Sequence, residues 1–469
     1  MEKEELAYLE LTEVAELIRS RQISSAEVTE TILERIGHQG PELHSYVTVT
    51  AEQAMEAARR ADAEIARGAY RGALHGVPVA IKDLANTADA PTAAGGTIHS
   101  GSVPGEDATV VRRLREAGAV ITGKLRMTEG AYAEHHPELP TPVNPWDGQT
   151  WTGSSSSGSG VATAAGLCYA SLGSDTGGSI RLPSTMNGVT GIKPTWGRVS
   201  RHGVFELAES LDHIGPMARS ARDAAAVLTV IAGEDPADPT ASSVPVPDYA
   251  ADLRLERAPI IGVDRGLLEI FDETTRSMLD DVLSVLRGLG WAVHQVELPD
   301  FRSISAEWEP MCAVETAAAH RETYPSKKEE YGPGLSTLIE AGRAMSAVDY
   351  QELLRKRRIF TGQMEKVFQG VDLLLLPGAG LASPTIDQMA ALGQTPELLA
   401  RLLIPTAPLD ISGSPTITLP GGFTPRGTPL GFQLCGADFS EDLLVRAAHA
   451  FQSVTTFHQR HPALVPAEA

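Results

Sequence analysis

The sequence predicts an α/β protein built around a mostly parallel or mixed sheet. From Gly76 onward, short apolar runs alternate with stretches of helical periodicity, and a strand-helix-strand order recurs in segments 259–263, 273–287 and 291–296. This alternation is typical of β-α units that feed one sheet. The 469 residues are 42% hydrophobic and 21% charged, an ordinary globular composition with enough apolar residues for a sizeable core.

The first 65 residues are expected to form helices. Apolar residues recur at helical spacing in segments 11–18 and 28–36, and Ser24 or Ser25 is placed to cap the second of these helices. A third helix is predicted over 50–67, because a glycine follows directly.

The middle of the chain changes in composition. A strand at 77–81, a helix at 108–116 and a strand at 119–122 come before it. Segment 151–200 then holds ten of the 44 glycines. Neither helix nor strand is expected there, apart from an apolar stretch at 161–167 that favours a buried helix.

The second half returns to alternating elements. A stretch rich in Pro, Ser and Asp at 234–248 precedes it, and 306–368 is expected to be mostly helical and highly charged, with breaks at Pro325 and 332–334. The remaining expected elements are strands at 371–376, 416–419 and 430–434 and a helix at 441–451.

Charge and cysteine content exclude several classes of protein. Lys and Arg number 39 against 60 Asp and Glu, a net charge of −21, which argues against nucleic acid or an anionic membrane as the main partner. Cys168, Cys312 and Cys435 form no C-x-x-C pair and fit free thiols in a reducing compartment. The acidic start is unlike a signal peptide and no run approaches roughly 18 apolar residues, so a cytoplasmic protein is expected.

Several segments resemble known catalytic or metal-binding motifs, but none of them matches a motif fully. Segment 118–124 has the spacing of a phosphate loop, yet Leu125 stands where Ser or Thr would bind magnesium. No G-x-S-x-G surrounds a serine, and the adjacent His135 and His136 lack metal-binding spacing. No metal or organic cofactor is expected.

Two loops rich in glycine and serine are the candidates for a catalytic site. They span 153–159 and 173–183, and series of small residues allow backbone N–H groups to approach a developing oxyanion. A flexible linker is the alternative, since Gly/Ser runs are flexible by default. The apolar character of 161–172 and the arginine and proline that follow Ser179 argue against a linker.

A serine nucleophile needs a base, and neither loop contains or adjoins a histidine. Lys82 follows the apolar run 77–81, where desolvation could make it a base near neutral pH. The alternative is an ion pair between Lys82 and Asp83 at the strand end, which spacing alone favours.

Taken together, three ordered blocks resemble the amidase signature family of serine hydrolases. They are 76–83 (GVPVAIKD), 153–159 (GSSSSGS) and 175–183 (DTGGSIRLP). Further similar segments lie at 191–200, 210–216, 413–415 and 429–434. The resemblance implies a single α/β domain over residues 1–469, with a large mixed sheet covered by helices on both sides.

The resemblance also implies a Ser-Ser-Lys triad. Ser179 would be the nucleophile, Lys82 the base, and Ser155, which in the family follows a cis peptide bond, the serine that bridges them. Ser154 departs from the family pattern, which usually has glycine there. The implied oxyanion donors are the backbone N–H groups of Thr176, Gly177, Gly178 and Ser179, and the implied loop-orienting residues are Ser156, Asp175 and Arg181.

The pocket walls are expected outside these blocks. The expected parts of the domain are N-terminal helices (1–65), a catalytic core (66–235) and a variable helical insert (306–368). Position favours segment 127–142 and the insert as the walls. Tyr132, Trp308 and Met311 would form an apolar lining, although core packing explains them equally well.

The expected function is hydrolysis of the C–N bond of small carboxylic amides through an acyl-enzyme on Ser179. The family also contains enzymes that act on esters and carbamates, so aryl esters and urethanes are further candidate substrates. One alternative is the glutamine-hydrolysing subunit of a tRNA-dependent amidotransferase, and another is a non-catalytic scaffold or binding protein. The expected partner is a small molecule, and the expected assembly is a monomer or homodimer.

Overall fold

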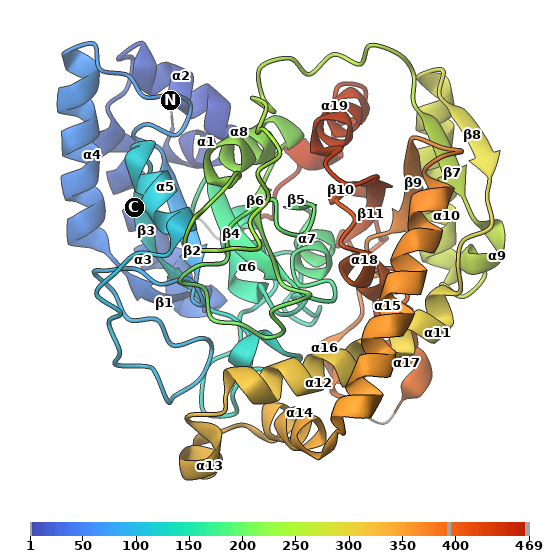
Figure 1. The fold of residues 1–469 in the computed structure, drawn as a ribbon. Coiled ribbons are helices and arrows are strands. Elements are labelled where there is room, and N and C mark those ends of the chain that lie inside the picture. The colour runs from blue at the N-terminus through green and yellow to red at the C-terminus, as the bar shows by residue number, and fades with distance from the viewer. Residues whose placement is uncertain (1, 392–394, 465–469) are drawn as a thin grey trace.

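The computed structural model of the protein describes residues 2–391 and 395–464. Within these residues, eleven strands form one sheet (Figure 1). The strands are β1 (Tyr46–Val49), β2 (Pro78–Lys82), β3 (Val120–Leu125), β4 (Ala170–Asp175), β5 (Thr190–Lys193), β6 (His213–Ala218), β7 (Ile260–Val263), β8 (Ala292–Gln295), β9 (Leu373–Pro377), β10 (Thr416–Phe423) and β11 (Pro429–Gly436).

The sheet is mixed, as predicted. Its order is β1-β3-β2-β4-β6-β5-β10-β11-β9-β7-β8. Strand β2 is parallel to β3 and β4, and β7 is parallel to β8 and β9, whereas the strands between β4 and β9 pair antiparallel. Two parallel β-α units are therefore joined through a central antiparallel segment.

The helices span most of the rest of the described chain. The α-helices are α1 (Lys3–Tyr8), α2 (Leu11–Arg19), α3 (Ser25–Leu43), α4 (Ala51–Ala66), α5 (Thr109–Glu116), α6 (Ser157–Ala164), α7 (Arg181–Asn187), α8 (Ala221–Ile231), α9 (Arg265–Leu268), α10 (Glu273–Gly288), α11 (Phe301–Ala306), α12 (Trp308–Ala319), α13 (Tyr324–Lys327), α14 (Pro333–Ala344), α15 (Ala347–Val367), α16 (Ile386–Ala390), α17 (Pro396–Leu403), α18 (Ala407–Ser412) and α19 (Glu441–Gln452). Short 3-10 helices are η1 (Glu129–Ala131), η2 (Lys328–Glu330) and η4 (Phe457–Gln459).

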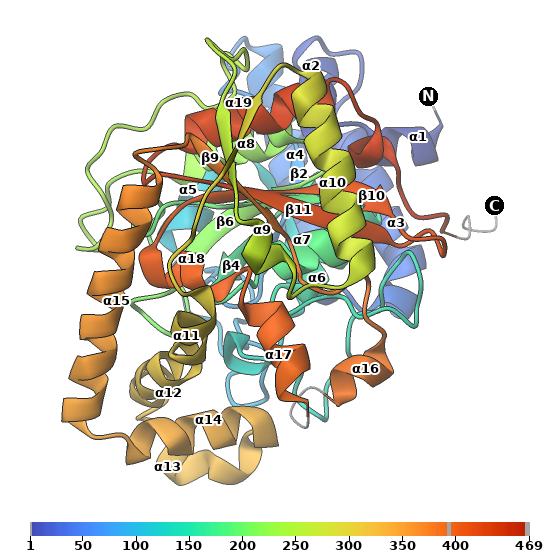
Figure 2. The same cartoon turned by 90° about the vertical axis from the view of Figure 1, so that its right-hand side faces the viewer.

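Helices cover both faces of the sheet, which confirms the predicted fold class. Helices α8 and α19 pack together on one face, and α6 and α7 pack together on the other (Figure 2). Candidate site residues come from β2, from the start of α6 and from the turn between β4 and α7. They therefore lie in and below the sheet, on the face that α6 and α7 cover.

Most of the predicted elements are present, with ends that differ by one or a few residues. The predicted strand at 77–81 is β2, the helix at 273–287 is α10, and Ser24 caps α3 by accepting the N–H of Glu27. Strand β1 was not predicted. It has only four residues and lies at the edge of the sheet, so its sequence carries little alternation.

The expectation of irregular structure in the glycine-rich region was wrong. Segment 151–200 contains α6, β4, α7 and β5, and α6 begins four residues before the predicted helix at 161–167. Every residue of α6 and β4 is buried. A Cβ on Gly158 would lie 2.5 Å from the carbonyl oxygen of Ser45, so the small residues here permit close packing of backbones.

Of the helices in the predicted helical insert, α12, α13 and α14 lie below the sheet in both ribbon views, whereas α15 runs upward beside it (Figures 1 and 2). The insert at 306–368 corresponds to α12 to α15, and the expected break near 332–334 falls where Pro333 begins α14. Helices α12 and α14 pack closely, since a Cβ on Gly342 would lie 1.8 Å from the carbonyl oxygen of Ala313. The first residue of α12 is Trp308.

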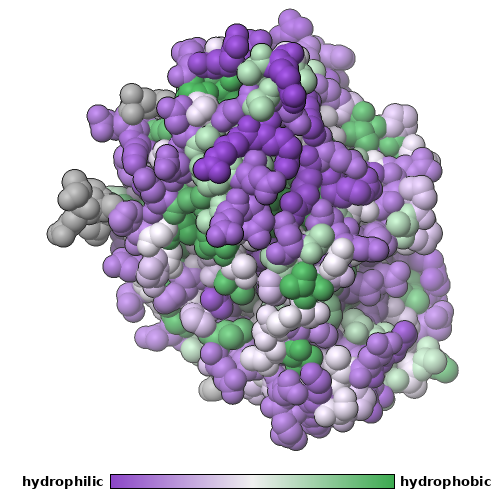
Figure 3. All heavy atoms as spheres, turned by 90° about the vertical axis from the view of Figure 1, so that its left-hand side faces the viewer, coloured by the Kyte–Doolittle hydropathy of each residue, from purple (hydrophilic) through white to green (hydrophobic). Residues whose placement is uncertain are grey.

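The face that carries α4 is largely hydrophilic. Apolar residues on it are scattered among polar ones rather than gathered in one patch (Figure 3). Among the described residues, no helix combines the length and the apolar character that crossing a membrane requires.

Candidate active site

Lys82 is the last residue of β2, and its amine is almost fully buried. Its Nζ lies within hydrogen-bond distance of three hydroxyl groups, those of Ser155 at 2.7 Å, Ser174 at 2.8 Å and Ser156 at 2.9 Å. Ser155 and Ser156 come from the serine-rich loop before α6, and Ser174 from β4, the strand next to β2. Two segments distant in sequence therefore meet at one amine.

The surroundings of Lys82 favour its neutral form. Desolvation lowers the pKa of Lys82 to about 7, and the negative charges of Asp175 and Asp212 only partly oppose it. Asp83 makes its ion pair with Lys124, at 3.1 Å. The alternative that pairs Lys82 with Asp83 is therefore wrong, because the two side chains point to different partners.

The serine-rich loop turns sharply before α6. Gly153 has a φ of +78°, and a Cβ there would lie 2.5 Å from the backbone nitrogen of Pro183, so only glycine fits. The Ser154–Ser155 peptide bond is cis, as the resemblance implied. The N–H of Ser156 donates to the carbonyl of Ser179 at 3.2 Å. The loop therefore touches the turn that carries the predicted nucleophile.

Ser179 lies in the turn 176–180 between β4 and α7, called here the Gly-Gly-Ser turn. Unlike Ser155 and Lys82, Ser179 is only partly buried, and it opens on a cavity of about 110 Å³. The cavity is lined by Ala131, Tyr132, Ala133, Trp151, Ser154, Gly177, Ser179, Leu182, Leu207, Trp308, Glu309, Met389, Leu399, Leu402 and Leu403. Its lining is mostly apolar, with Glu309 as the one charged residue among these.

Asp175 and Arg181 hold the two ends of the Gly-Gly-Ser turn. The carboxylate of Asp175 accepts the N–H groups of Gly178 at 2.6 Å and Ile180 at 2.9 Å, and it pairs with the Arg181 guanidinium at 2.8 Å. Although burial raises it, the pKa of Asp175 lies well below its usual range because of the charge of Arg181. Asp175 therefore orients the turn as an ionised carboxylate.

One of the four implied oxyanion donors is occupied. The N–H of Gly178 is bonded to Asp175, so in this structure it is not directed at a substrate. In the described part of the chain, the N–H groups of Thr176, Gly177 and Ser179 donate to no protein acceptor, and of these three residues only Gly177 and Ser179 line the cavity. These two amides fit the role of oxyanion donor better than Gly178 does.

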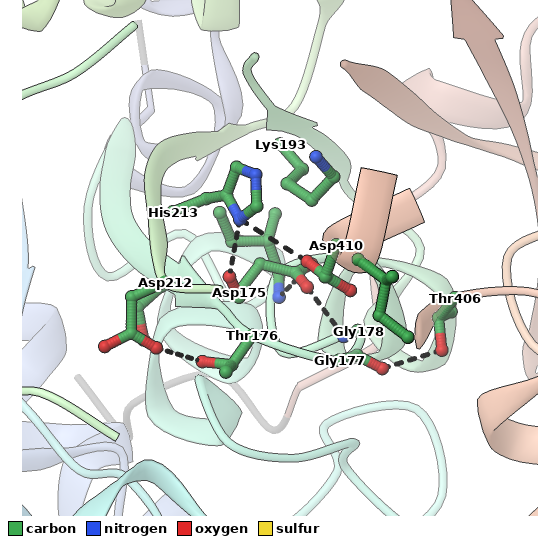
Figure 4. Close-up of polar contacts among 12 residues, drawn as sticks. Asp175, Thr176, Gly177, Gly178, Lys193, Asp212, His213, Thr406 and Asp410 are labelled. Atoms are coloured by element: carbon green, nitrogen blue, oxygen red, sulfur yellow. Dashed lines mark hydrogen bonds and ion pairs between the residues drawn. The ribbon is translucent and has the colours of Figure 1, made fainter. Parts of the chain in front are cut away.

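Three further side chains fix the turn from outside. Thr176 donates its hydroxyl to Asp212 at 2.6 Å, and the carbonyl of Thr176 accepts the indole N–H of Trp308 at 2.7 Å. The Thr406 hydroxyl donates to the carbonyl of Gly177 at 2.7 Å. In Figure 4 the turn lies between Asp212 on one side and Thr406 on the other.

A buried group of charged residues lies next to the turn, above it in the view of Figure 4. Asp410 in α18 pairs with Arg181 at 2.5 Å and lies 3.5 Å from His213 Nδ1. Burial raises the pKa of Asp410 well above its ordinary value, and burial lowers the pKa of Lys193 to about 8. Asp175 and Asp410 both contact the guanidinium of Arg181. Asp410 therefore links α18 to Asp175 and to the turn.

The structure thus brings the nine candidate residues of the two loops and β2 into one network of contacts, in which Gly177 and Ser179 line the cavity. Of the predicted wall residues, Tyr132 and Trp308 line the cavity, whereas Met311 is buried in the core and does not. The sequence missed the wall from α16 and α17 and the roles of Ser174 and Thr406. Only Ser174 had a usable signal in the sequence, because it lies in the candidate loop 173–183, directly before Asp175. No group of three or more His, Cys, Asp or Glu residues among those described is arranged to hold a metal ion.

The chain is similar to known proteins over nearly its whole length. A model of the family described as Amidase matches residues 27–445. A Mycobacterium tuberculosis protein provisionally named amidase AmiD is 60% identical over 462 residues, which cover 98% of this chain and 97% of that protein. A glutamyl-tRNA(Gln) amidotransferase subunit of Moorella thermoacetica is 38% identical over 489 residues, with 98% and 99% covered. The structure is similar to that of native peptide amidase from Stenotrophomonas maltophilia, with a TM-score of 0.84 and 29% identity over 97% of this chain and 98% of that one.

Proposed function

This chain belongs to the amidase family, and we propose that it hydrolyses the C–N bond of small carboxylic amides through an acyl-enzyme on Ser179. One observation carries the proposal: a buried lysine with a pKa of about 7 contacts Ser155, and the loop of Ser155 touches the turn of the only triad serine that opens on the cavity. A base, a relay and an accessible nucleophile are the parts that acyl transfer needs.

The proposed reaction runs through a proton relay. Neutral Lys82 accepts the proton of Ser155, which accepts the proton of Ser179 as that oxygen attacks the acyl carbon. The carbonyl oxygen becomes an oxyanion, stabilised by the N–H groups of Gly177 and Ser179. The proton then returns through Ser155 to the leaving nitrogen, the C–N bond breaks, and the ester on Ser179 is hydrolysed by water along the same path in reverse.

The cavity supports a preference for small apolar groups. Its volume of about 110 Å³ is of the same order as the roughly 150 Å³ of an engineered apolar cavity that binds benzene. Tyr132, Trp151 and Trp308 are the aromatic part of its lining. We therefore expect a short aliphatic or single-ring acyl or leaving group, in an amide, an aryl ester or a carbamate.

Glutamine hydrolysis for an amidotransferase is the second candidate, because a relative of that name is 38% identical. Glutamine carries a carboxylate that a site must pair with a cation, since an unpaired buried charge is costly. Among the described lining residues there is no Lys, Arg or His, and Glu309 would repel that carboxylate. The composition of the cavity therefore favours the stand-alone amidase.

Active-site labelling and a substrate panel test the proposal. We expect wild-type protein to react with a serine-directed fluorophosphonate and to hydrolyse small apolar primary amides or anilides without partner chains. Ser179→Ala should lose both, and Lys82→Ala should lose turnover while remaining folded by circular dichroism. Labelling retained by Ser179→Ala would refute the nucleophile assignment, and a wild-type protein that neither labels nor hydrolyses would favour the non-catalytic scaffold.

The same panel separates the substrate classes. Amide, ester and carbamate probes with one common acyl group would rank the three bonds, and glutamine serves as the anionic comparison. Turnover of glutamine above that of the neutral amides would favour the glutamine-hydrolysing role instead.

A further inference from the structure

The Gly-Gly-Ser turn contains two successive peptide units whose carbonyl groups are both held by side chains. The carbonyl of Thr176 accepts the indole N–H of Trp308 at 2.7 Å, and the carbonyl of Gly177 accepts the hydroxyl of Thr406 at 2.7 Å, as Figure 4 shows for Thr406. Trp308 and Thr406 themselves come from α12 and from the chain just before α18. The orientation of these two peptide planes is therefore set by residues distant in sequence.

Each held carbonyl also sets the direction of the next N–H. In a planar trans peptide, the C=O of one residue and the N–H of the next point in opposite directions. Both peptides are trans, because the one cis bond of the described chain lies between Ser154 and Ser155. Trp308 therefore fixes the N–H of Gly177, and Thr406 fixes the N–H of Gly178.

The two amide groups end in different surroundings. The N–H of Gly178 donates to Asp175 at 2.6 Å and serves the structure of the turn. The N–H of Gly177 has no acceptor among the described residues, and Gly177 lines the same cavity as Ser179. The amide that Trp308 orients is thus the one free to meet a substrate oxygen.

Close packing holds the indole in this position. A Cβ on Gly177 would lie 2.5 Å from Cε2 of the indole, so the ring lies directly against the peptide and only glycine fits beneath it. Trp308 is 7% exposed. A hydrogen bond to the carbonyl also polarises the peptide and strengthens its N–H as a donor.

We propose that Trp308 is a positioning residue of the oxyanion hole, which orients and polarises the Gly177 N–H toward the developing oxyanion. The inference rests on the proposed function and deepens it, because it assigns to the helical insert a part in the acyl-transfer step besides forming a wall. It separates the two oxyanion candidates from Gly178, whose N–H is already bonded.

Removing only the indole donor tests the proposal. Trp308→Phe keeps an aromatic wall, and Trp308→benzothienylalanine keeps the bicyclic ring while replacing the N–H with sulfur. For both we expect kcat to fall about 10- to 100-fold, less than or similar to the loss of a whole oxyanion donor. KM should change about twofold or less in the benzothienylalanine variant. Rates are divided by the number of sites that a fluorophosphonate titrates, so that misfolded protein does not count.

Inhibitor binding gives a readout that a purely structural role would not move. A trifluoromethyl ketone is attacked by Ser179 and forms an oxyanion, whereas the matching alcohol fills the cavity without one. Affinity for the ketone should fall by the same factor as kcat, with affinity for the alcohol unchanged. Equal losses for both inhibitors, or an unchanged kcat in the benzothienylalanine variant, would overturn the proposal.

Two other tryptophans serve as controls. Trp151→Phe alters the same cavity wall at a residue that makes no hydrogen bond to the turn, so it measures how much of any change in KM and kcat comes from altering the wall alone. Trp291→Phe changes a buried tryptophan that does not line the cavity and is expected to leave both constants unchanged. A wild-type protein that neither labels nor hydrolyses amides would refute the proposed function, whereas an active wild type with an unaffected Trp308 variant refutes this inference alone.

Discussion

At the scale of a residue, the hydroxyl groups around Lys82 determine which protonation states its amine can adopt. A hydroxyl accepts from an ammonium group and donates to a neutral amine, so Ser155, Ser156 and Ser174 can hold the side chain in either state. A carboxylate in the same place would stabilise the cation and raise the pKa. Burial among hydroxyls leaves desolvation as the main influence, and it lowers the pKa of Lys82 to about 7.

Activity should therefore depend on pH through Lys82. The base is active when neutral, so kcat/KM is expected to fall about tenfold per unit below pH 7 and to level off above it. The measurement is a pH–rate profile on a neutral amide, whose own charge does not change over the range. A flat profile between pH 5 and pH 9 would contradict the assignment of Lys82 as the base.

Short motifs explain which site residues could be predicted from sequence. Lys82, Ser155 and Ser179 stand in blocks with unusual local composition, and the structure brings the first two to 2.7 Å. Thr406 meets Gly177 across 229 residues, and a threonine in an ordinary segment carries no sign of that contact. Its place depends on the order of the strands, which no local pattern encodes.

At the scale of elements, helix α12 of the helical insert contacts the site directly through Trp308. The helix begins at Trp308, and it is held from below by α14, where Gly342 meets the carbonyl of Ala313. The sequence predicted a helical insert here, because helical periodicity is a local property. It could not predict that Trp308 rather than Met311 faces the cavity, because that depends on how the helices pack.

Gly342→Ala should push α12 and α14 apart. Its Cβ would lie 1.8 Å from a backbone oxygen, so the helices must shift, and we expect the free energy of unfolding to fall by about 1–3 kcal/mol. Because α12 carries Trp308, kcat should fall as well. Urea denaturation and steady-state kinetics measure the two effects.

Gly362→Ala is the matched control for this change. Gly362 lies inside α15 and a Cβ there meets nothing within 4 Å, so the substitution should raise the free energy of unfolding by up to about 1 kcal/mol. A Gly342→Ala protein as stable as this control would show that the α12–α14 contact is not tight in solution.

The sheet connects the two halves of the chain at the scale of the whole molecule. Strand β5 pairs directly with β10, so the strands of the first half (β1 to β6) and those of the second half (β7 to β11) belong to one continuous sheet. On the face that α6 and α7 cover, Asp410 of α18 forms an ion pair with Arg181 of α7. This ion pair links the same two halves at the site. The fold class was predictable because alternating apolar runs are local, whereas this strand order is not.

A continuous sheet predicts that the 469 residues unfold as one unit, which is the single domain that the family resemblance implies. Small single domains commonly unfold in one step, and chains of this length often do not, so the test is informative. Far-UV circular dichroism, tryptophan fluorescence and loss of fluorophosphonate labelling should give one common midpoint in a thermal or urea titration. The probes report on different parts, since Trp291 lies beside the edge strand β8 and Trp308 lies at the cavity. If labelling were lost at a lower midpoint than the circular dichroism signal, the helical insert would be separating from the sheet before the sheet itself unfolds, and the site would depend on a unit less stable than its support.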